Sequence, residues 1–103
     1  MGGIIYLLSN GNGHYKIGVT KGKISNRLKQ LQTGNSSKLE CLHEYATPYY
    51  RKLEVTLHNN YVSKRLEGEW FDLTKEDILD FIPVCQRLHE TFKYLEEYNN
   101  PFI

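Results

Sequence analysis

The hydrophobic pattern begins with two short β-type runs. Residues 4–9 and residues 15–19 are rich in isoleucine, leucine, valine and tyrosine, which favour extended backbone. The segment between them, Asn10-Gly11-Asn12-Gly13, is typical of a tight turn because glycine and asparagine accept positive φ angles. The pattern therefore predicts that the chain opens with a β-hairpin.

A helix and a third strand are predicted to follow the hairpin. Residues 23–32 repeat apolar side chains at helical spacing, and Gly34 lies where such a helix would end. Residues 39–46 are predicted to be extended. The apolar face of the helix is formed by Ile24, Leu28 and Leu31.

A second helix and a short extended segment come next. Thr47 is suited to an N-cap and Pro48 to the first helical position, so this helix should run to about residue 62. Gly68 then breaks the chain, and residues 69–73 are predicted to be a short strand or extended segment.

The last element is predicted to be a third helix. Thr74 and Asp77 form a variant capping box at its start, and Pro83 should kink or split it. The element order is ββαβαβα, which is a small α+β domain covering residues 1–103. The core stripe of this helix comprises Ile78, Phe81, Ile82, Cys85, Leu88, Phe92 and Leu95.

Length and composition exclude several classes of protein. A chain of 103 residues that is 40% apolar and 13% aromatic is one packed domain rather than a disordered segment. No apolar run approaches the roughly 20 residues that span a bilayer, and the start lacks a signal-peptide pattern. Cys41 and Cys85 are isolated, which favours small core residues of a reduced, intracellular protein over a zinc site.

The positive charge is unevenly distributed although the net charge is only +1. Residues 1–39 carry a charge of +6 and contain no Asp or Glu, whereas residues 40–103 carry −5. The cluster is either a set of solvated lysines or a surface that faces a polyanion. In the second case the phosphate-binding side chains would include Lys21, Lys23, Lys29 and Lys38.

Three residues of this basic half point to a phosphodiester. Tyr6 and Lys16 come from the two strands of the predicted hairpin, and Arg27 comes from the helix that follows. They can share one small surface with no acid nearby in sequence.

Glu54 is out of place in the second helix. Helical spacing puts its carboxylate beside an apolar stripe that includes Tyr50 and Tyr61, and His58 follows one turn later. A carboxylate in such a position must be paired, hydrogen-bonded or bound to a metal. Two interpretations stay open: an ion pair with an Arg or Lys, or a metal ligand or acid–base group. Mg²⁺ needs few protein ligands when a phosphate supplies others.

These residues together resemble the GIY-YIG nuclease superfamily. The motifs are Gly3-Ile4-Ile5-Tyr6, Lys16-Ile17-Gly18, Arg27-Leu28 with Gln32-Thr33-Gly34, Glu54-x-x-x-His58 and Gly68-Glu69-Trp70-Phe71. The motif Lys16-Ile17-Gly18 resembles that of a branch of the superfamily in which KIG replaces YIG. This branch is common among phages and large DNA viruses. The resemblance covers residues 3–73, and residues 74–103 form a C-terminal helical extension.

The resemblance implies a three-stranded antiparallel sheet flanked by helices and a metal-dependent hydrolysis of DNA, with Mg²⁺ or Mn²⁺ as cofactor. By position, Tyr6 would activate or orient the attacking water and Lys16 would take the place of the second tyrosine. Arg27 would hold the scissile phosphate, and Glu54 would bind the metal.

The chain also departs from the family pattern. The asparagine expected after the metal-binding glutamate has no match, so His58 is either its replacement or a structural histidine. His14, at the hairpin end, is a second general-base candidate. Trp70 and Phe71 are expected to be core residues rather than a base-stacking platform.

The resulting functional prediction is a DNA endonuclease with low intrinsic sequence specificity. A homodimer or a protein partner would then supply specificity. The alternatives are a catalytically inactive nucleic-acid-binding module and a protein-interaction module on the same fold.

Overall fold

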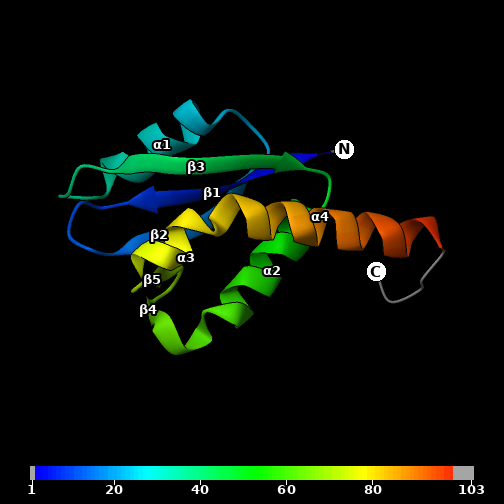
Figure 1. Cartoon of the computed structure of the whole chain (residues 1–103). Helices are drawn as coiled ribbons and strands as arrows, with labels where there is room; N and C mark the ends of the chain where they lie inside the picture. The colour runs from blue at the N-terminus through cyan, green and yellow to red at the C-terminus, as the bar shows by residue number, and fades with distance from the viewer. Residues whose placement is uncertain (1, 99–103) are drawn as a thin grey trace.

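A five-stranded sheet lies at the centre of the structure, a computed structural model that describes residues 2–98 (Figure 1). The predicted domain 1–103 also includes residue 1 and residues 99–103, which lie outside the described part. The strands are β1 Gly3–Ser9, β2 Tyr15–Thr20, β3 Glu40–Thr47, β4 Arg65–Glu67 and β5 Trp70–Phe71. The helices are α1 Ile24–Thr33, α2 Tyr50–Asn60, the 3₁₀ turn η1 Val62–Lys64, α3 Lys75–Leu79 and α4 Phe81–Glu97.

The strand order is β3-β1-β2-β5-β4, and every neighbouring pair is antiparallel. The predicted α+β class is confirmed, and the hairpin forms as expected, with Gly11 and Gly13 at φ angles of 78° and 83°. The prediction of three strands is wrong, because β4 and β5 extend the sheet. β5 lies within the short strand or extended segment predicted at residues 69–73. β4 has three residues and no alternating apolar pattern, so only its pairing with β5 defines it.

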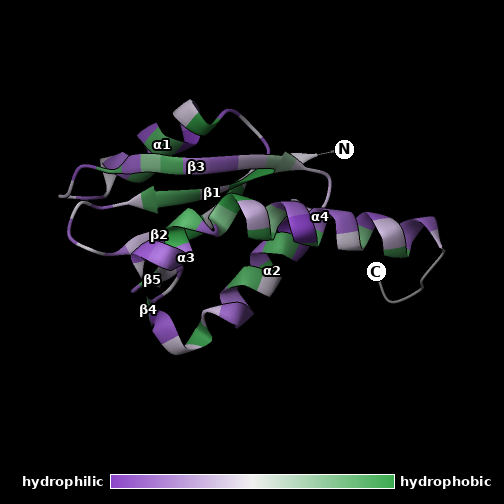
Figure 2. Cartoon of the chain, in the orientation of Figure 1, coloured by the Kyte–Doolittle hydropathy of each residue, from purple (hydrophilic) through white to green (hydrophobic). Residues whose placement is uncertain are grey.

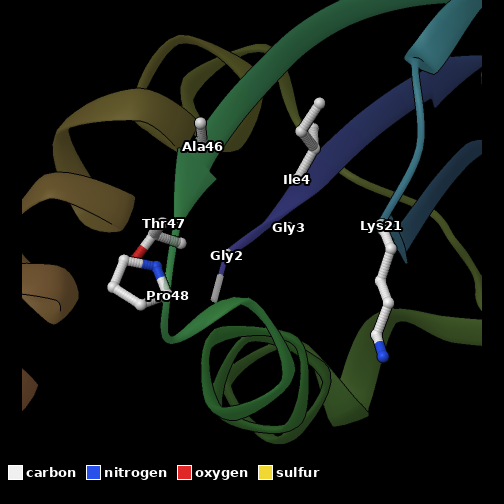
Figure 3. Close-up of a pocket in the computed structure, with 7 residues that line it drawn as sticks. All are labelled: Gly2, Gly3, Ile4, Lys21, Ala46, Thr47 and Pro48. Atoms are coloured by element: carbon white, nitrogen blue, oxygen red, sulfur yellow. The ribbon is translucent and has the colours of Figure 1, made fainter.

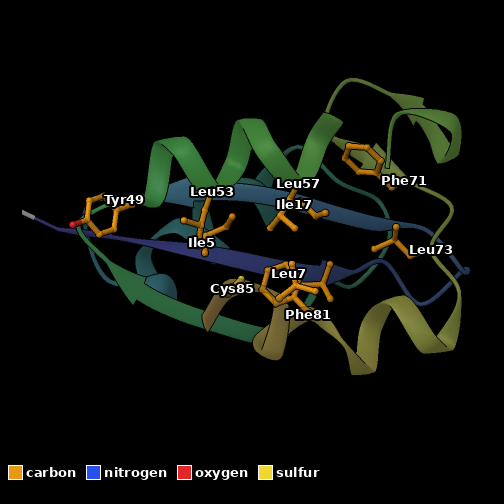
Figure 4. Packing of buried hydrophobic residues seen from close by; sticks show 11 residues of the cluster. Ile5, Leu7, Ile17, Tyr49, Leu53, Leu57, Phe71, Leu73, Phe81 and Cys85 are labelled. Atoms are coloured by element: carbon orange, nitrogen blue, oxygen red, sulfur yellow. The ribbon is translucent and has the colours of Figure 1, made fainter. Parts of the chain in front are cut away.

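Helices cover both faces of the sheet (Figure 1). On one face α2 and α4 enclose the larger core, which includes Ile5, Ile17 and Leu53 (Figure 4). On the other face α1 packs over Tyr6, Leu8 and Leu39. The buried strands are hydrophobic and the outer helix faces are polar, as Figure 2 shows by colour. Successive residues of β1 and β2 therefore point into different cores.

The helix ends differ from expectation in two places. Thr47 is the last residue of β3 rather than an N-cap, and α2 begins at Tyr50. The Thr47 hydroxyl instead accepts a hydrogen bond from the Tyr49 backbone N–H (3.1 Å) and contacts His89 Nδ1 (2.8 Å). The last helix is split at Asp80, not at Pro83. Pro83 falls in the first turn of α4, where a missing N–H costs nothing.

The predicted start of the third helix is confirmed. Thr74 and Asp77 form a reciprocal capping box at α3. The predicted apolar stripe enters the larger core except for Leu95, which lies further along α4. Cys41 is half-buried and Cys85 is buried, and both are free thiols. Among residues 2–98, no helix combines the length and apolarity needed to cross a bilayer.

Candidate active site

Tyr6 and Arg27 meet on the face of the sheet that α1 covers. The Arg27 Nε–H donates a long hydrogen bond of 3.4 Å to the Tyr6 hydroxyl. This bond, with the tyrosine's charge, raises the pKa of Arg27 above its ordinary value. Tyr6 is paired with Gly18 across the β1–β2 ladder. A Cβ atom at Gly18 would lie 2.5 Å from the Tyr6 hydroxyl oxygen, so only glycine lets the phenol cross β2 here.

The Tyr6 side chain is fully buried, with 0% of its surface exposed. Arg27 is partly exposed and lies at the hydroxyl end of the phenol. The guanidinium therefore has an open side toward solvent, while the hydroxyl does not. A group that draws Arg27 away from Tyr6 would give the hydroxyl access to water.

Lys16 lies on the same face and forms an ion pair with Glu69. The distance between Lys16 Nζ and a Glu69 carboxylate oxygen is 2.9 Å. Lys16 is the more enclosed partner, with its side chain 14% exposed against 38% for Glu69. Its ammonium also lies 5.8 Å from the centre of the Trp70 ring. Tyr15, its neighbour in β2, packs into the core on the opposite face, as strand alternation predicts.

Glu54, His58 and Glu69 bring three donor atoms together. One carboxylate oxygen from each glutamate and one imidazole nitrogen all lie within 4.8 Å of one another. Glu54 and His58 are one turn apart on α2, whereas Glu69 immediately precedes β5. Carboxylate oxygens suit Mg²⁺ and Mn²⁺, and imidazole suits several other transition metals. The donor set therefore fits a divalent cation.

The orientation of His58 is determined by two contacts. His58 Nε2 lies 2.9 Å from the Ile17 carbonyl oxygen, and its ring centre lies 5.1 Å from that of Phe71. Because a carbonyl oxygen only accepts hydrogen bonds, Nε2 must carry the proton. Nδ1 then keeps its lone pair for a proton or a cation.

Glu54 is electrostatically strained in this position. Burial raises the pKa of its carboxyl above the usual value, and the neighbouring negative charge of Glu69 adds to the increase. His58 and Lys16 act in the opposite direction without cancelling it. A cation bound between the two carboxylates would relieve this repulsion.

An opening in the sheet allows these two groups to meet. β2 pairs with β5 only at Tyr15 and Lys16, and no strand within residues 2–98 pairs with residues 18–20 on that side. Through this opening, side chains of α2 approach residues on the α1 face. The charge of Glu69 also acts on Arg27, so the tyrosine–arginine pair and the carboxylate cluster share one electrostatic environment.

The structure thus places the five predicted site residues in two adjoining groups. Tyr6 and Arg27 form the first group, and Glu54, His58 and Lys16 form the second together with Glu69. His14 is exposed at the hairpin end and is not part of the carboxylate cluster.

The four predicted phosphate-binding lysines are all exposed. Lys23 and Lys29 lie at the start and in the middle of α1, and Lys38 precedes β3. Lys21 lies at the rim of a separate open cavity of about 570 Å³ near the end of β3 and the start of α2 (Figure 3). Among residues 2–98 none of the four forms a salt bridge.

Sequence reasoning assigned no role to Glu69 and expected Trp70 to be core. Phe71 is fully buried as expected, and Trp70 packs against the smaller core of Tyr6, Leu8 and Leu39 while remaining partly exposed. The signal for Glu69 was present in the Gly68-Glu69-Trp70-Phe71 motif. Gly68, at a φ angle of 57°, turns the chain just before this glutamate.

Comparisons with known proteins place the chain in a family. Searches of curated proteins and of solved structures gave no significant match. The model of the T5orf172 domain matches residues 3–86, which include all the site residues described above. On this match, the chain belongs to the T5orf172 domain family.

Proposed function

We propose that this domain is a divalent-metal-dependent endonuclease that hydrolyses DNA phosphodiester bonds in the manner of GIY-YIG nucleases. The main observation in support is that a tyrosine–arginine pair lies next to a cluster with two carboxylates at the opening beside β2. The T5orf172 family is itself suggestive of a nuclease-like or DNA-binding role. Membership of the GIY-YIG superfamily is part of the proposal.

Arg27 is the phosphate-binding residue in this proposal. Its guanidinium is partly exposed and already faces the site, and planar N–H groups can hold a phosphate through two oxygens. When Arg27 turns toward a phosphate, its bond to Tyr6 is released. The hydroxyl then becomes able to orient the attacking water.

Glu54 and Glu69 would hold the metal ion, with His58 beside them. When bound, the cation would act as a Lewis acid and offset negative charge on the phosphoryl oxygens. Glu54 lies on a rigid helix, and the Ile17 carbonyl orients His58. These contacts keep the donor groups in place before the substrate arrives.

Lys16 takes the position of the second tyrosine of related nucleases and neutralises Glu69. Its ammonium is a point charge on a flexible stem, so it would be able to move from Glu69 to a phosphate oxygen of a bound strand.

A cleavage assay tests the proposal. Supercoiled plasmid, branched DNA and RNA are incubated with Mg²⁺ or Mn²⁺, with EDTA as the metal-free condition. We expect nicking of DNA only with a divalent metal, and at least about 100-fold slower nicking by Glu54→Gln. Glu90→Gln, an exposed α4 substitution, is the matched control and should cleave as wild type. Absence of cleavage on every substrate, or equal cleavage by Glu54→Gln, would contradict the proposal.

A non-catalytic nucleic-acid-binding module is the second candidate. Two features favour it. The Tyr6 hydroxyl is buried, and Lys16 and Glu69 are paired with each other, so groups that hydrolysis needs are not free to contact a substrate or a metal. DNA binding without cleavage in any metal would support this candidate.

A further inference from the structure

A second concave site adjoins the candidate active site at the hairpin end of the sheet. It is an open cavity of about 350 Å³, which is large enough for one heterocyclic base. Its lining comes from the hairpin, the α1–β3 connection and the β4–β5 hairpin. The lining residues are Asn10, His14, Asn35, Leu66, Glu67 and Trp70.

Trp70 links this cavity to the candidate active site. It pairs with Lys16 across the β2–β5 ladder, and the Lys16 ammonium contacts its ring. The indole is partly exposed, and Leu66, which is 49% exposed, adds a second apolar wall. An aromatic ring beside a cation, at the mouth of a cavity, is the arrangement on which bases stack in single-strand-binding proteins.

Two asparagines present hydrogen-bond donors to the same cavity. Asn10 Oδ1 accepts bonds from the backbone N–H groups of Asn12 (2.8 Å) and His14 (3.3 Å). Asn35 Oδ1 accepts one from the backbone N–H of Ser37 (3.0 Å). These bonds fix the amide orientation, and in the described part of the chain neither Nδ2 group has an acceptor. The cavity is therefore lined by two asparagines whose amide donors have no partner in the described part, and such donors match the acceptor atoms on base edges.

The neighbourhood also favours a nucleic acid strand over other ligands. Lys16 lies two residues along β2 from Gly18, the partner of Tyr6, so the cavity and the tyrosine–arginine pair are in line on one face. Two strand residues span about 7 Å. A strand whose phosphate contacts Arg27 can thus bring a neighbouring base to Trp70.

We propose that this cavity is a nucleobase subsite, in which a base next to the scissile phosphate stacks on Trp70 and accepts hydrogen bonds from Asn10 and Asn35. The inference rests on the proposed function, because it places the phosphate of the same strand at Arg27. It gives Trp70 a substrate-positioning role in addition to its packing against the smaller core.

Trp70 is the only tryptophan of the chain, so its emission reports on the subsite directly. A fluorescein-labelled single-stranded oligonucleotide is titrated in EDTA, and anisotropy and tryptophan emission are recorded together. We expect binding to quench Trp70 emission. An oligonucleotide of equal length built from abasic nucleotides should bind more weakly and leave the emission nearly unchanged. Anisotropy that rises without quenching, or equal quenching by the abasic strand, would overturn the subsite while leaving the proposed function intact. If neither oligonucleotide binds, the subsite is overturned, and the plasmid-nicking assay decides separately on the proposed function.

Substitutions give the second measurement. Trp70→Leu should weaken oligonucleotide binding by about 5-fold to 100-fold, whereas Trp70→Phe, which keeps an aromatic face, should weaken it less. Tyr98→Leu removes an exposed aromatic ring just after the end of α4 and serves as the control. Circular dichroism confirms that each variant is folded. Equal affinity of Trp70→Leu and wild type would overturn the proposal.

Discussion

At the scale of single residues, Glu54 shows that a site can be prepared for a ligand at some expense of stability. Burial and the charge of Glu69 raise the pKa of its carboxyl, so the folded protein binds this proton more tightly than the unfolded chain does. The stability from this group is fully present below the usual glutamate pKa near 4.5 and is lost as the pH rises through the folded-state value.

Glu54→Gln should therefore stabilise the metal-free protein at pH 7. The gain should be below about 1 kcal/mol, because solvent screens part of the repulsion, and it should vanish below pH 4. Urea denaturation in EDTA at both pH values measures it. Glu90→Gln is the control, since its exposed carboxylate has no such neighbour. A destabilised Glu54→Gln protein, or a gain that is independent of pH, would show that the carboxylate is not strained.

Glu54 and Glu69 also show what single residues reveal before a structure is known. Helical periodicity was enough to identify Glu54 as a candidate site residue, because it lies on the same helix as the apolar residues beside it. Glu69 could not be identified in this way. Its neighbours Lys16 and Glu54 are distant in sequence, and they come together with Glu69 only through the pairing of β2 with β5 and the packing of α2 against β2.

At the scale of elements, the β1–β2 pair depends on one close approach. Tyr6 crosses β2 at Gly18, where a Cβ atom would overlap its hydroxyl group. The phenol is fully buried, so it cannot move aside without disturbing Leu8 and Leu39 in the same core.

We expect Gly18→Ala to lower the free energy of unfolding by about 1–3 kcal/mol, as for overpacked core positions. It should also abolish DNA cleavage, since Tyr6 is displaced. Gly22→Ala is the matched control: a Cβ there meets nothing within 4 Å, so stability should change little. Chemical denaturation and plasmid nicking measure the two effects. If Gly18→Ala has the stability of wild type, the contact does not constrain this strand pair.

Elements with a strong local pattern could be predicted, and elements defined by tertiary pairing could not. The hairpin, α1, β3 and α4 carry apolar periodicity or turn residues of their own. β5 lies within the extended segment predicted at residues 69–73, but β4 is too short for such a pattern, and the pairing of both strands with the sheet was not predicted. The start of α2 was misplaced because the Thr47 hydroxyl bonds the Tyr49 N–H and His89 at the end of a strand. Both errors concern contacts that form only in the folded protein.

At the scale of the whole molecule, the basic and acidic parts of the sequence lie on different helices and strands. The N-terminal basic residues lie on β2, on α1 and in the adjoining loops, whereas α3 and α4 carry five of the twelve acidic residues and Asp80 lies between these two helices. The acid-free half also contains Tyr6 and Arg27. Binding of a polyanion is therefore expected on the α1 side.

Replacing Lys23, Lys29 and Lys38 together by Gln should weaken DNA binding and its salt dependence. The slope of log K against log[salt] should become shallower by about 0.7–0.9 for each phosphate contact that is lost. Lys75, Arg87 and Lys93, changed together to Gln, make a control with the same loss of charge on α3 and α4. Affinity is measured by anisotropy between low and moderate salt. Equal weakening by both triple variants would show that net charge, not the α1 surface, controls binding.

The short pairing of β2 with β5 has a consequence for inhibition. Ile17 donates its backbone N–H to the Glu69 carbonyl and its own carbonyl faces His58, but beyond Ile17 the backbone of β2 is an incomplete sheet edge, and such edges accept added strands. Here this edge borders the opening where Glu54 and His58 approach Glu69. An extended peptide that hydrogen-bonds to β2 would fill that opening and separate the carboxylates from Arg27. On the proposed function, such a peptide would be a competitive blocker of DNA cleavage that needs no likeness to DNA.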